Sequence, residues 1–397
     1  MIKKHFPLFK NYPNLIYLDN AATTHKPLVM LEALSEYYSL FNSNIGRGAY
    51  DLAQKSEQCY MDSKKIVADF LNVNSHNIIY TSGSTESINL ASYIANQHRN
   101  KNKKYIILPI SEHHANVLIW QKLAQDNNLE PYWISDPLLI ANPEQINAEI
   151  LEQAAIFTIA QVSNVTGEVF PVDKWCSLAK KLNSISIVDG AQGITSLTID
   201  LNQIDCDFYV FSAHKLYGPM GLGILYIKDK FLNSQPLKLG GGIIEDVDLY
   251  SHEYIEESNK FEAGTPNVSN AYAFSKTLQF LQMNNWKELL NYTHELGVYL
   301  DEQLNSINVK KVLLGGFPTT HISSFVFPNI HSHDVGTFLA NKNMAVRVGK
   351  HCAYPLHKHL NVNSSVRASL GIYNTKEDVD NLIKTLKECI DFFGEKL

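Results

Sequence analysis

The sequence Ser212-Ala213-His214-Lys215-Leu216-Tyr217-Gly218-Pro219 directly follows the apolar run Phe208–Phe211. An apolar run that ends in a polar loop is typical of a strand that brings functional side chains to the edge of a sheet. Short apolar runs also alternate with helical patterns, such as Lys55–Leu71, through the first two thirds of the chain. We predict strands at Ile78–Thr81, Tyr105–Pro109, Ile156–Gln161, Ile185–Asp189, Phe208–Phe211 and Gly223–Ile227. Because these runs are apolar nearly throughout, they predict an α/β fold with a mostly parallel sheet covered on both faces.

Polar residues follow the predicted strands where the apolar runs end. They are Ser82–Thr85, His113 and His114, Asn164, Asp189–Gln192, and Ser212–Lys215. Ligands of open α/β sheets bind outside the carboxyl ends of the strands. We therefore expect one ligand site to which several strand ends contribute.

The pattern changes after about Phe261, where the sequence predicts a smaller α+β domain. Its expected elements are helical stretches at Ala271–Leu304 and Asp378–Phe393 and short strands at Ile322–Phe327 and Ala345–Val348. We predict three parts: an N-terminal segment, residues 1–17, that packs on the small domain; a large α/β domain, residues 18–262; and the small domain, residues 263–397.

Composition and charge exclude several classes of protein. The chain has 397 residues, of which 45% are hydrophobic and 19% are charged, as in globular proteins and unlike disordered, collagen-like or coiled-coil chains. The formal net charge of −6 argues against nucleic acid or an anionic membrane as a partner. The sequence has no signal peptide and no apolar run of about 18 residues, so we expect a cytoplasmic protein without a membrane span.

Lys215 and Asp189 each have a plain and a functional interpretation. Lys215 is either a solvated loop lysine or an amine held near a carbonyl cofactor and kept partly neutral, as Schiff-base chemistry requires. Asp189 is a helix N-cap, a metal ligand, or a carboxylate that pairs with the pyridinium nitrogen of pyridoxal phosphate (PLP). Lys215 follows Asp189 by 26 positions, enough for one helix and one strand, so both side chains can reach one site.

Two further segments are open in the same way. Ser82–Thr85 leads from a strand into a helix and is either an ordinary helix cap or a phosphate site built from free N–H groups and hydroxyls. The adjacent His113 and His114 suggest zinc, but neighbouring residues project in different directions and no third ligand stands at metal spacing. We therefore predict no metal and expect a histidine that stacks on an aromatic cofactor ring.

The five cysteines differ in their surroundings, and their odd number and wide spacing argue against a disulfide framework. Four are expected to be packing residues: Cys59, Cys176, Cys206 and Cys389. Cys352 follows Lys350 and His351, and cations favour the nucleophilic thiolate. It is either a surface-loop cysteine or a nucleophile.

Taken in order, these segments resemble one known family. The resemblance also includes Leu18-Asp19-Asn20-Ala21-Ala22-Thr23-Thr24, Arg347-Val348-Gly349-Lys350-His351-Cys352-Ala353 and Val366-Arg367-Ala368-Ser369-Leu370. From about Tyr17 to Asp380 the chain resembles the class V aminotransferase-fold PLP enzymes, specifically the group II (SufS-type) cysteine desulfurases. The resemblance implies the type I fold of PLP-dependent transferases, with PLP as cofactor and L-cysteine as substrate. It also implies a homodimer and a SufE- or SufU-like protein that accepts sulfur for iron–sulfur cluster assembly.

The resemblance further implies roles for individual residues. The catalytic residues would be Lys215, which carries the cofactor, Cys352, which takes the sulfur as a persulfide, and His113, which handles protons. The cofactor-binding residues would be Lys215, Asp189, Gln192, His113, Ser84, Thr85, Asn164, Ser212, His214 and Thr265, the last reaching the phosphate of the neighbouring subunit. Arg367 would bind the substrate carboxylate, with Arg347 and Asn164 also on the substrate side.

Alternative functions stay open at this point. Selenocysteine lyase and cysteine sulfinate desulfinase share the fold but depend less on an active-site thiol, so Cys352 favours the desulfurase. A non-catalytic scaffold of the same fold disagrees with the joint presence of Lys215, Asp189 and Arg367. The chain also departs from close family members at Asn44–Tyr50, which lacks the two histidines usual there.

Overall fold

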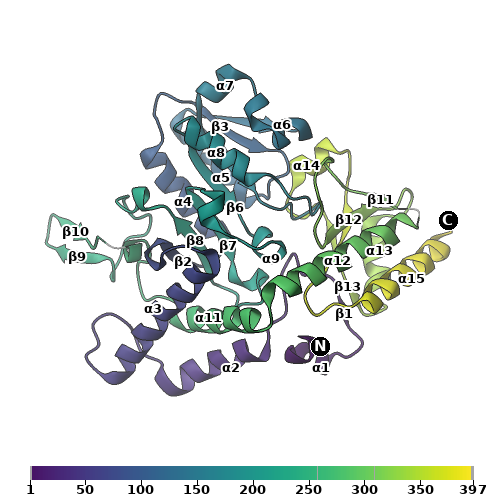
Figure 1. Ribbon diagram of the computed structural model, residues 1–397, viewed down its shortest axis with the longest axis horizontal. Coiled ribbons are helices and arrows are strands. Elements are labelled where there is room, and N and C mark those ends of the chain that lie inside the picture. Colours follow the sequence, from purple (N-terminus) through teal and green to yellow (C-terminus); the bar gives the residue numbers. More distant parts are fainter. Residues whose placement is uncertain (1, 257, 308, 395–397) are drawn as a thin grey trace.

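The computed structural model describes residues 2–256, 258–307 and 309–394. Among these residues, the largest sheet has seven strands in the order β2-β8-β7-β6-β5-β3-β4 (Figure 1). Their bounds are β2 Ile78–Thr81, β3 Tyr105–Pro109, β4 Glu130–Ile134, β5 Ala154–Ala160, β6 Ile185–Asp189, β7 Phe208–Ser212 and β8 Gly223–Ile227. All neighbours are parallel except β8, which is antiparallel to β2 and β7. The predicted α/β fold with a mostly parallel sheet is confirmed.

The six strands predicted from apolar runs are present, with small differences at their ends. The strand β4 was not predicted. It is an edge strand in which Glu130 is exposed and Pro131 holds the second position. Edge strands tolerate proline and polar residues, so they lack the continuous apolar run of a strand buried on both faces.

Helices cover both faces of this sheet. They are α4 (Ser84–His98) and α5 (Ala115–Asn127) on one face, and α3 (Asp51–Leu71), α8 (Val172–Lys181) and α11 (Val268–Met283) on the other. Ile78 belongs to the core beneath α3 and Ile79 to the core beneath α4, because consecutive strand residues point to opposite faces. Two covered faces explain why the strands of this sheet are apolar nearly throughout.

A smaller antiparallel sheet lies at the other end of the molecule, with the strand order β11-β12-β15-β14 (Figure 1). Its strands are β11 Lys310–Lys311, β12 Ile322–Val326, β14 Arg347–Gly349 and β15 Ser365–Ser369. The helices α12 (Trp286–Asn305), α13 (Ser332–Ala340) and α15 (Lys376–Phe393) pack on it. The helical stretch predicted at Ala271–Leu304 is two helices, α11 and α12, because the chain turns at Asn285 in a left-handed conformation (φ 55°).

The N-terminal segment joins the two sheets. Phe6 and Phe9 pack against Tyr373, with ring centroids 4.8 and 4.7 Å apart. The strand β1 (Ile16–Tyr17) pairs in parallel with β13 (Met344–Ala345), which precedes β14. The division into domains at residues 17 and 262 stays a prediction.

The remaining helices and helical turns are short. The helices are α1 (Pro7–Asn11), α2 (Leu28–Glu36), α6 (Pro137–Ala141), α7 (Ala148–Glu152), α9 (Gly193–Ser196), α10 (Leu201–Ile204) and α14 (Tyr354–His359). The turns are Ile2–His5, Tyr37–Phe41, Ser75–Asn77, Pro143–Gln145, Ala213–Lys215, Asp229–Phe231 and Ser258–Phe261.

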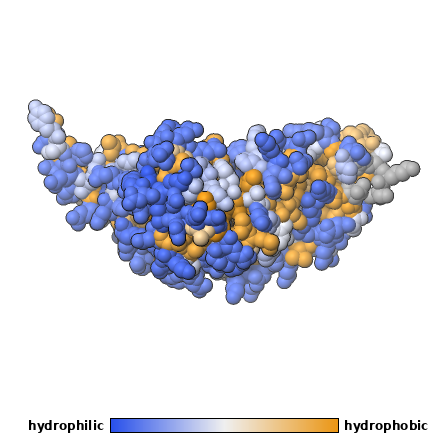
Figure 2. Space-filling model, turned by 90° about the horizontal axis from the view of Figure 1, so that it is seen from above, coloured by the Kyte–Doolittle hydropathy of each residue, from blue (hydrophilic) through white to orange (hydrophobic). Residues whose placement is uncertain are grey.

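A hairpin of β9 (Ile244–Val247) and β10 (His252–Tyr254) projects from one end of the molecule, at the left in Figure 1 and Figure 2. At its tip, Leu249 and Tyr250 are 90% and 96% exposed. Among the described residues, no helix combines the length and hydropathy needed to cross a membrane.

Candidate active site

Asp189 and Lys215 come from neighbouring strands of the large sheet. Asp189 is the last residue of β6, and Lys215 closes the helical turn after β7. Asp189 is buried, and its Oδ1 accepts a hydrogen bond from the N–H of Ala191 (3.0 Å). Burial raises the pKa of Asp189, and the positive charge of Lys215 opposes that shift. Burial also lowers the pKa of Lys215, so its amine loses a proton more readily than a surface lysine.

His113 lies just before α5 and belongs to the same cluster. Its Nδ1 accepts a hydrogen bond from the N–H of Ala115 (3.1 Å), which requires Nδ1 to be unprotonated. Burial, and then the charge of Lys215, lower the pKa of His113 to about 3. The ring is therefore neutral near pH 7 and carries its proton on Nε2.

Ser84 and Ser212 lie together at the beginning of α4. The Oγ of Ser212 accepts a hydrogen bond from the N–H of Ser84 (2.7 Å) and donates one to its Oγ (3.0 Å). A Cβ on Gly223 would lie 2.4 Å from the backbone just before Ser84, so β8 can approach only as glycine. The Nδ1 of His214 is buried and has no partner among the described residues. With the exposed hydroxyl of Thr85 in the same turn, these groups form a cradle suited to an anion.

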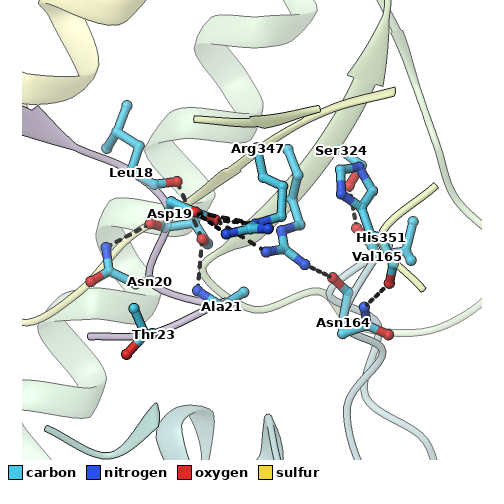
Figure 3. Close-up of polar contacts among 12 residues, drawn as sticks. Leu18, Asp19, Asn20, Ala21, Thr23, Asn164, Val165, Ser324, Arg347 and His351 are labelled. Carbon is cyan, nitrogen blue, oxygen red and sulfur yellow. Dashed lines mark hydrogen bonds and ion pairs between the residues drawn. The ribbon is translucent and has the colours of Figure 1, made fainter. Parts of the chain in front are cut away.

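Gln192 and Asn164 are buried amides that connect the edge of the large sheet to other parts of the chain. The Nε2 of Gln192 donates to the carbonyl of Ala21 in the N-terminal segment (2.7 Å). The Nδ2 of Asn164 donates to the carbonyl of His351 (2.7 Å), as Figure 3 shows, and its own carbonyl accepts from Nη1 of Arg367 (2.8 Å). Asn164 therefore ties the loop of Cys352 to the arginine on β15.

The loop that carries Cys352 has a strained backbone. His351 and Cys352 have φ values of 48° and 55°, in the left-handed region that residues other than glycine rarely adopt. The carbonyl of Cys352 accepts a hydrogen bond from the N–H of His114 (2.8 Å). Beneath the loop, the Oγ of Ser365 lies 2.9 Å from Nε2 of His351 and 3.1 Å from Nε2 of His357. Polar contacts on both sides thus fix the position of the thiol.

Cys352 is exposed, and its side chain lies close to cations. Its charge acts to raise the pKa of Lys215, Arg347 and Arg367, which places the thiol within electrostatic range of all three. The other cysteines are buried or partly buried: Cys59, Cys176, Cys206 and Cys389. Burial raises the pKa of the first three, which disfavours the reactive thiolate.

Arg347 and Arg367 lie directly opposite each other on β14 and β15. Arg367 is buried, whereas Arg347 is exposed. Both contact the carboxylate of Asp19, toward which the side chain of Arg347 points in Figure 3. The sequence analysis quoted Asp19 within a motif but did not assign it to the site, because the pairing depends on the register of strands far apart in the sequence.

Thr265 is the predicted residue that the chain does not bring to this cluster. It is exposed and lines a cavity of about 1060 Å³ together with residues such as Arg47 and Gly242. Lys215 and Asp189 do not line this cavity.

Glu112 and His114 also belong to the site but were not assigned from the sequence. Glu112 is fully buried, where Oε2 accepts from Nδ2 of Asn116 (2.6 Å) and Oε1 from the N–H of Ala160 (2.9 Å). Burial raises the pKa of Glu112 to about 8. The spacing of Glu112 and Asn116, one helical turn apart, was the available signal. The described residues contain no cluster of three or more acidic, histidine or cysteine side chains that could hold a metal ion.

Comparison with known proteins places this arrangement in a family. The model of the family described as "Aminotransferase class-V" matches residues 16–382. The chain belongs to this family. Among its relatives, a probable cysteine desulfurase of Halalkalibacterium halodurans is 36% identical, over 99% of this chain and 98% of the relative. A probable cysteine desulfurase of Vibrio cholerae is 34% identical, over 98% of each chain.

Solved structures of class V members agree with the fold of this one. The apo cysteine desulfurase of Thermococcus onnurineus superposes with a TM-score of 0.91 at 31% identity, covering 98% of each chain. The cysteine desulfurase CsdA of Escherichia coli superposes with a TM-score of 0.88, also at 31% identity and 98% coverage of each chain. The resemblance to cysteine desulfurases that the motifs predicted is confirmed.

Proposed function

We propose that this protein is a PLP-dependent cysteine desulfurase that converts L-cysteine to L-alanine and takes the sulfur on Cys352 as a persulfide. The observation that carries the proposal is the position of the exposed Cys352 thiol within electrostatic range of Lys215 and Arg367. A nucleophile, an amine with a lowered pKa and a guanidinium for a carboxylate are the groups that this reaction needs in one place. Relatives and structural neighbours that are cysteine desulfurases support the assignment.

The side chains at the edge of the large sheet fit PLP. Lys215 would carry the cofactor, and the buried carboxylate of Asp189 would hold its pyridinium nitrogen. The unpartnered Nδ1 of His214 and the paired hydroxyls of Ser84 and Ser212 at the beginning of α4 would hold the phosphate. Bound there, PLP would supply an electron sink for the pair of electrons left when the Cα proton of the substrate is removed.

The residues of the chain perform the remaining tasks. Arg367 binds the substrate carboxylate through its planar guanidinium. The Nζ of Lys215, whose pKa is lowered by burial, accepts the Cα proton. The neutral ring of His113 has a proton on Nε2 available for transfer within the site.

Sulfur transfer requires the thiolate of Cys352 to attack the sulfur of the substrate. The new bond joins the two sulfur atoms, and the Cβ–S bond of the substrate breaks. The electron pair of that bond stays with the carbon, which is protonated and released as part of L-alanine. Cys352 keeps the transferred sulfur and one proton, so no external oxidant or reductant is needed.

The exposed Cys352 supports further proposals about partners. A persulfide at the surface is open to a SufE- or SufU-like acceptor, which would pass the sulfur to iron–sulfur cluster assembly in the cytoplasm. We also propose a homodimer in which Thr265, which lies apart from Lys215, completes the phosphate site of the neighbouring subunit. The exposed hairpin tip at Leu249 and Tyr250 is apolar surface available to a second copy.

Mass spectrometry of the purified holoenzyme after addition of L-cysteine tests the proposed function. We expect the Cys352 peptide to gain one sulfur atom and the peptide of the partly exposed Cys59 to gain none. The variant Cys352→Ser should lose the modification while keeping the visible absorbance of bound PLP. Sulfur on another cysteine, or persulfide formation at the wild-type rate in Cys352→Ser, contradicts the assignment. Alanine release from cysteine sulfinate or selenocysteine without any need for Cys352 would favour the alternative activities.

A further inference from the structure

The carboxylate of Asp19 contacts both guanidinium groups of the site (Figure 3). Its Oδ1 accepts hydrogen bonds from Nε of Arg347 (3.0 Å) and Nη2 of Arg367 (3.2 Å), and its Oδ2 accepts one from Nη2 of Arg347 (2.7 Å). Only 13% of the Asp19 side chain and 3% of the Arg367 side chain are exposed. Water therefore screens this part of the cluster weakly, and each charge in it has a strong effect on the others.

The three side chains together carry one net positive charge. Arg347 and Arg367 occupy directly opposite positions of an antiparallel pair, where like charges repel. Asp19 compensates one of the two charges. The Nε of Arg367 is buried and has no partner among the described residues, so this edge of the guanidinium is ready to donate to an incoming carboxylate. A ligand with one negative charge then leaves the cluster balanced.

We propose that Asp19 is a specificity-determining residue, which limits the substrates of this site to amino acids whose total charge from acidic groups is −1. A second negative charge on the ligand side chain would need its own cation. Arg347 is the arginine next to Cys352 on the substrate side, and Asp19 already occupies its Nε and Nη2. The proposal rests on the proposed function in one respect, the binding of the substrate carboxylate by Arg367.

Other charged groups around the site do not replace Arg347 in this role. Lys215 and Asp189 face each other and compensate each other's charge. His113 and His351 are neutral at pH 7, because burial lowers their pKa values to about 3 and about 2. The Nζ of Lys350 lies 4.9 Å over the ring of a neighbouring tyrosine. The charge of Asp19 therefore has no counterpart that would admit a dianionic ligand.

The test compares two unreactive probes, butyrate and succinate, by calorimetric titration of the holoenzyme. The probes have the same number of carbon atoms but carry one and two carboxylates. The variant Asp19→Asn keeps the shape of the side chain and removes its charge. We expect the affinity for succinate, relative to butyrate, to rise about tenfold, which corresponds to one unit charge about 6 Å away at an effective dielectric constant of about 40. Activity with cysteine sulfinate relative to cysteine should rise in the same direction.

Two further variants separate charge from structure. Asp301→Asn changes the net charge of the protein equally but acts at a half-buried ion pair with Lys311 on the small domain, so the ratio of affinities should stay at the wild-type value. Arg347→Gln combined with Asp19→Asn returns the cluster to one positive charge and should restore the wild-type ratio.

Two results would overturn the proposal: an unchanged ratio in Asp19→Asn, or equal loss of affinity for both probes in that variant. If Asp19→Asn does not fold, Arg347→Gln alone, at an exposed side chain, should lower the ratio, and a constant ratio there also refutes the proposal. Calorimetry does not depend on turnover. Failure of sulfur transfer to Cys352 with a shifted ratio would refute the proposed function and leave the role of Asp19 intact.

Discussion

Replacing His114 with alanine tests whether contacts from outside the loop hold Cys352 in its reactive position. The ring of His114 accepts a hydrogen bond at Nε2 from the N–H of Tyr354 (3.2 Å) and meets the ring of Tyr354 edge-on at 4.8 Å. The alanine variant loses both contacts. It retains the backbone hydrogen bond from residue 114 to the carbonyl of Cys352 (2.8 Å).

The expected magnitude follows from the backbone of the loop. The left-handed conformations of His351 and Cys352 cost about 1–2 kcal/mol each, hence about 2–4 kcal/mol together. The hydrogen bond to His114 contributes about 1 kcal/mol and the ring contact about 0.5–1.5 kcal/mol. Losing about 1.5–2.5 kcal/mol removes much of what offsets the strain. The rate of persulfide formation should therefore fall roughly ten- to seventyfold.

Rapid-quench mass spectrometry of the Cys352 peptide in a single turnover measures that rate. Bound PLP should keep its absorbance, because His114 does not contact the cofactor side of the site. The matched control is His98→Ala, which removes a histidine hydrogen-bonded to Ser234 (2.8 Å) on α4 and should leave the rate unchanged. The variant His114→Gln, which retains an acceptor, should recover part of the loss. A wild-type rate in His114→Ala would show that the loop holds its conformation without this contact.

Three further changes have expected outcomes in unfolding experiments. Lys64→Met leaves the buried carboxylate of Glu262 without its cation (2.8 Å) and should lower the free energy of unfolding by about 3–5 kcal/mol in guanidinium titrations, more than Lys64→Met with Glu262→Leu does; an equal loss would refute this. The pKa of His113 is lowered to about 3, so the unfolded chain binds the proton first; stability should fall as pH drops from about 6.5 toward 3, and less steeply in His113→Phe. Gly190→Ala would place a Cβ 2.0 Å from the ring of Tyr209 and should destabilise the protein by about 1–3 kcal/mol in thermal melts, so an unchanged melting temperature would show that the ring moves aside.

Much of the large sheet could be predicted from the sequence, because strands buried on both faces have apolar side chains at every position. The polar residues at the strand ends were predictable for the same reason, since they interrupt those runs. The edge strand β4, with Glu130 and Pro131, lacks the signal. The break between α11 and α12 at Asn285 interrupts the backbone without interrupting the apolar periodicity, so the sequence favoured one continuous stretch.

Contacts between distant segments were not predictable in the same way. The three hydrogen bonds of Asp19 to the arginines depend on the register of β14 and β15, which places Arg347 opposite Arg367. Register is set by tertiary packing and leaves no local pattern in the sequence. The support that His114 gives to the cysteine loop is also long-range, because it comes from a helix far away in the chain.

The asymmetry of the Asp19 cluster explains how one site stays stable without substrate and still accepts it. Two uncompensated guanidiniums about 5 Å apart would repel by about 3 kcal/mol at an effective dielectric constant of about 20. A resident carboxylate removes this repulsion, but one that fully occupied Arg367 would exclude the substrate. Asp19 binds Arg347 through both Nε and Nη2, at 2.7–3.1 Å, and contacts Arg367 through Nη2 alone, at 3.2 Å. Arg347 thus holds the carboxylate of Asp19 in place, and Arg367, its Nε unpartnered among the described residues, stays open to the substrate. Because Asp19 pairs through its backbone with Ser369 on β15, the N-terminal segment is part of the site and its charge is fixed relative to both arginines.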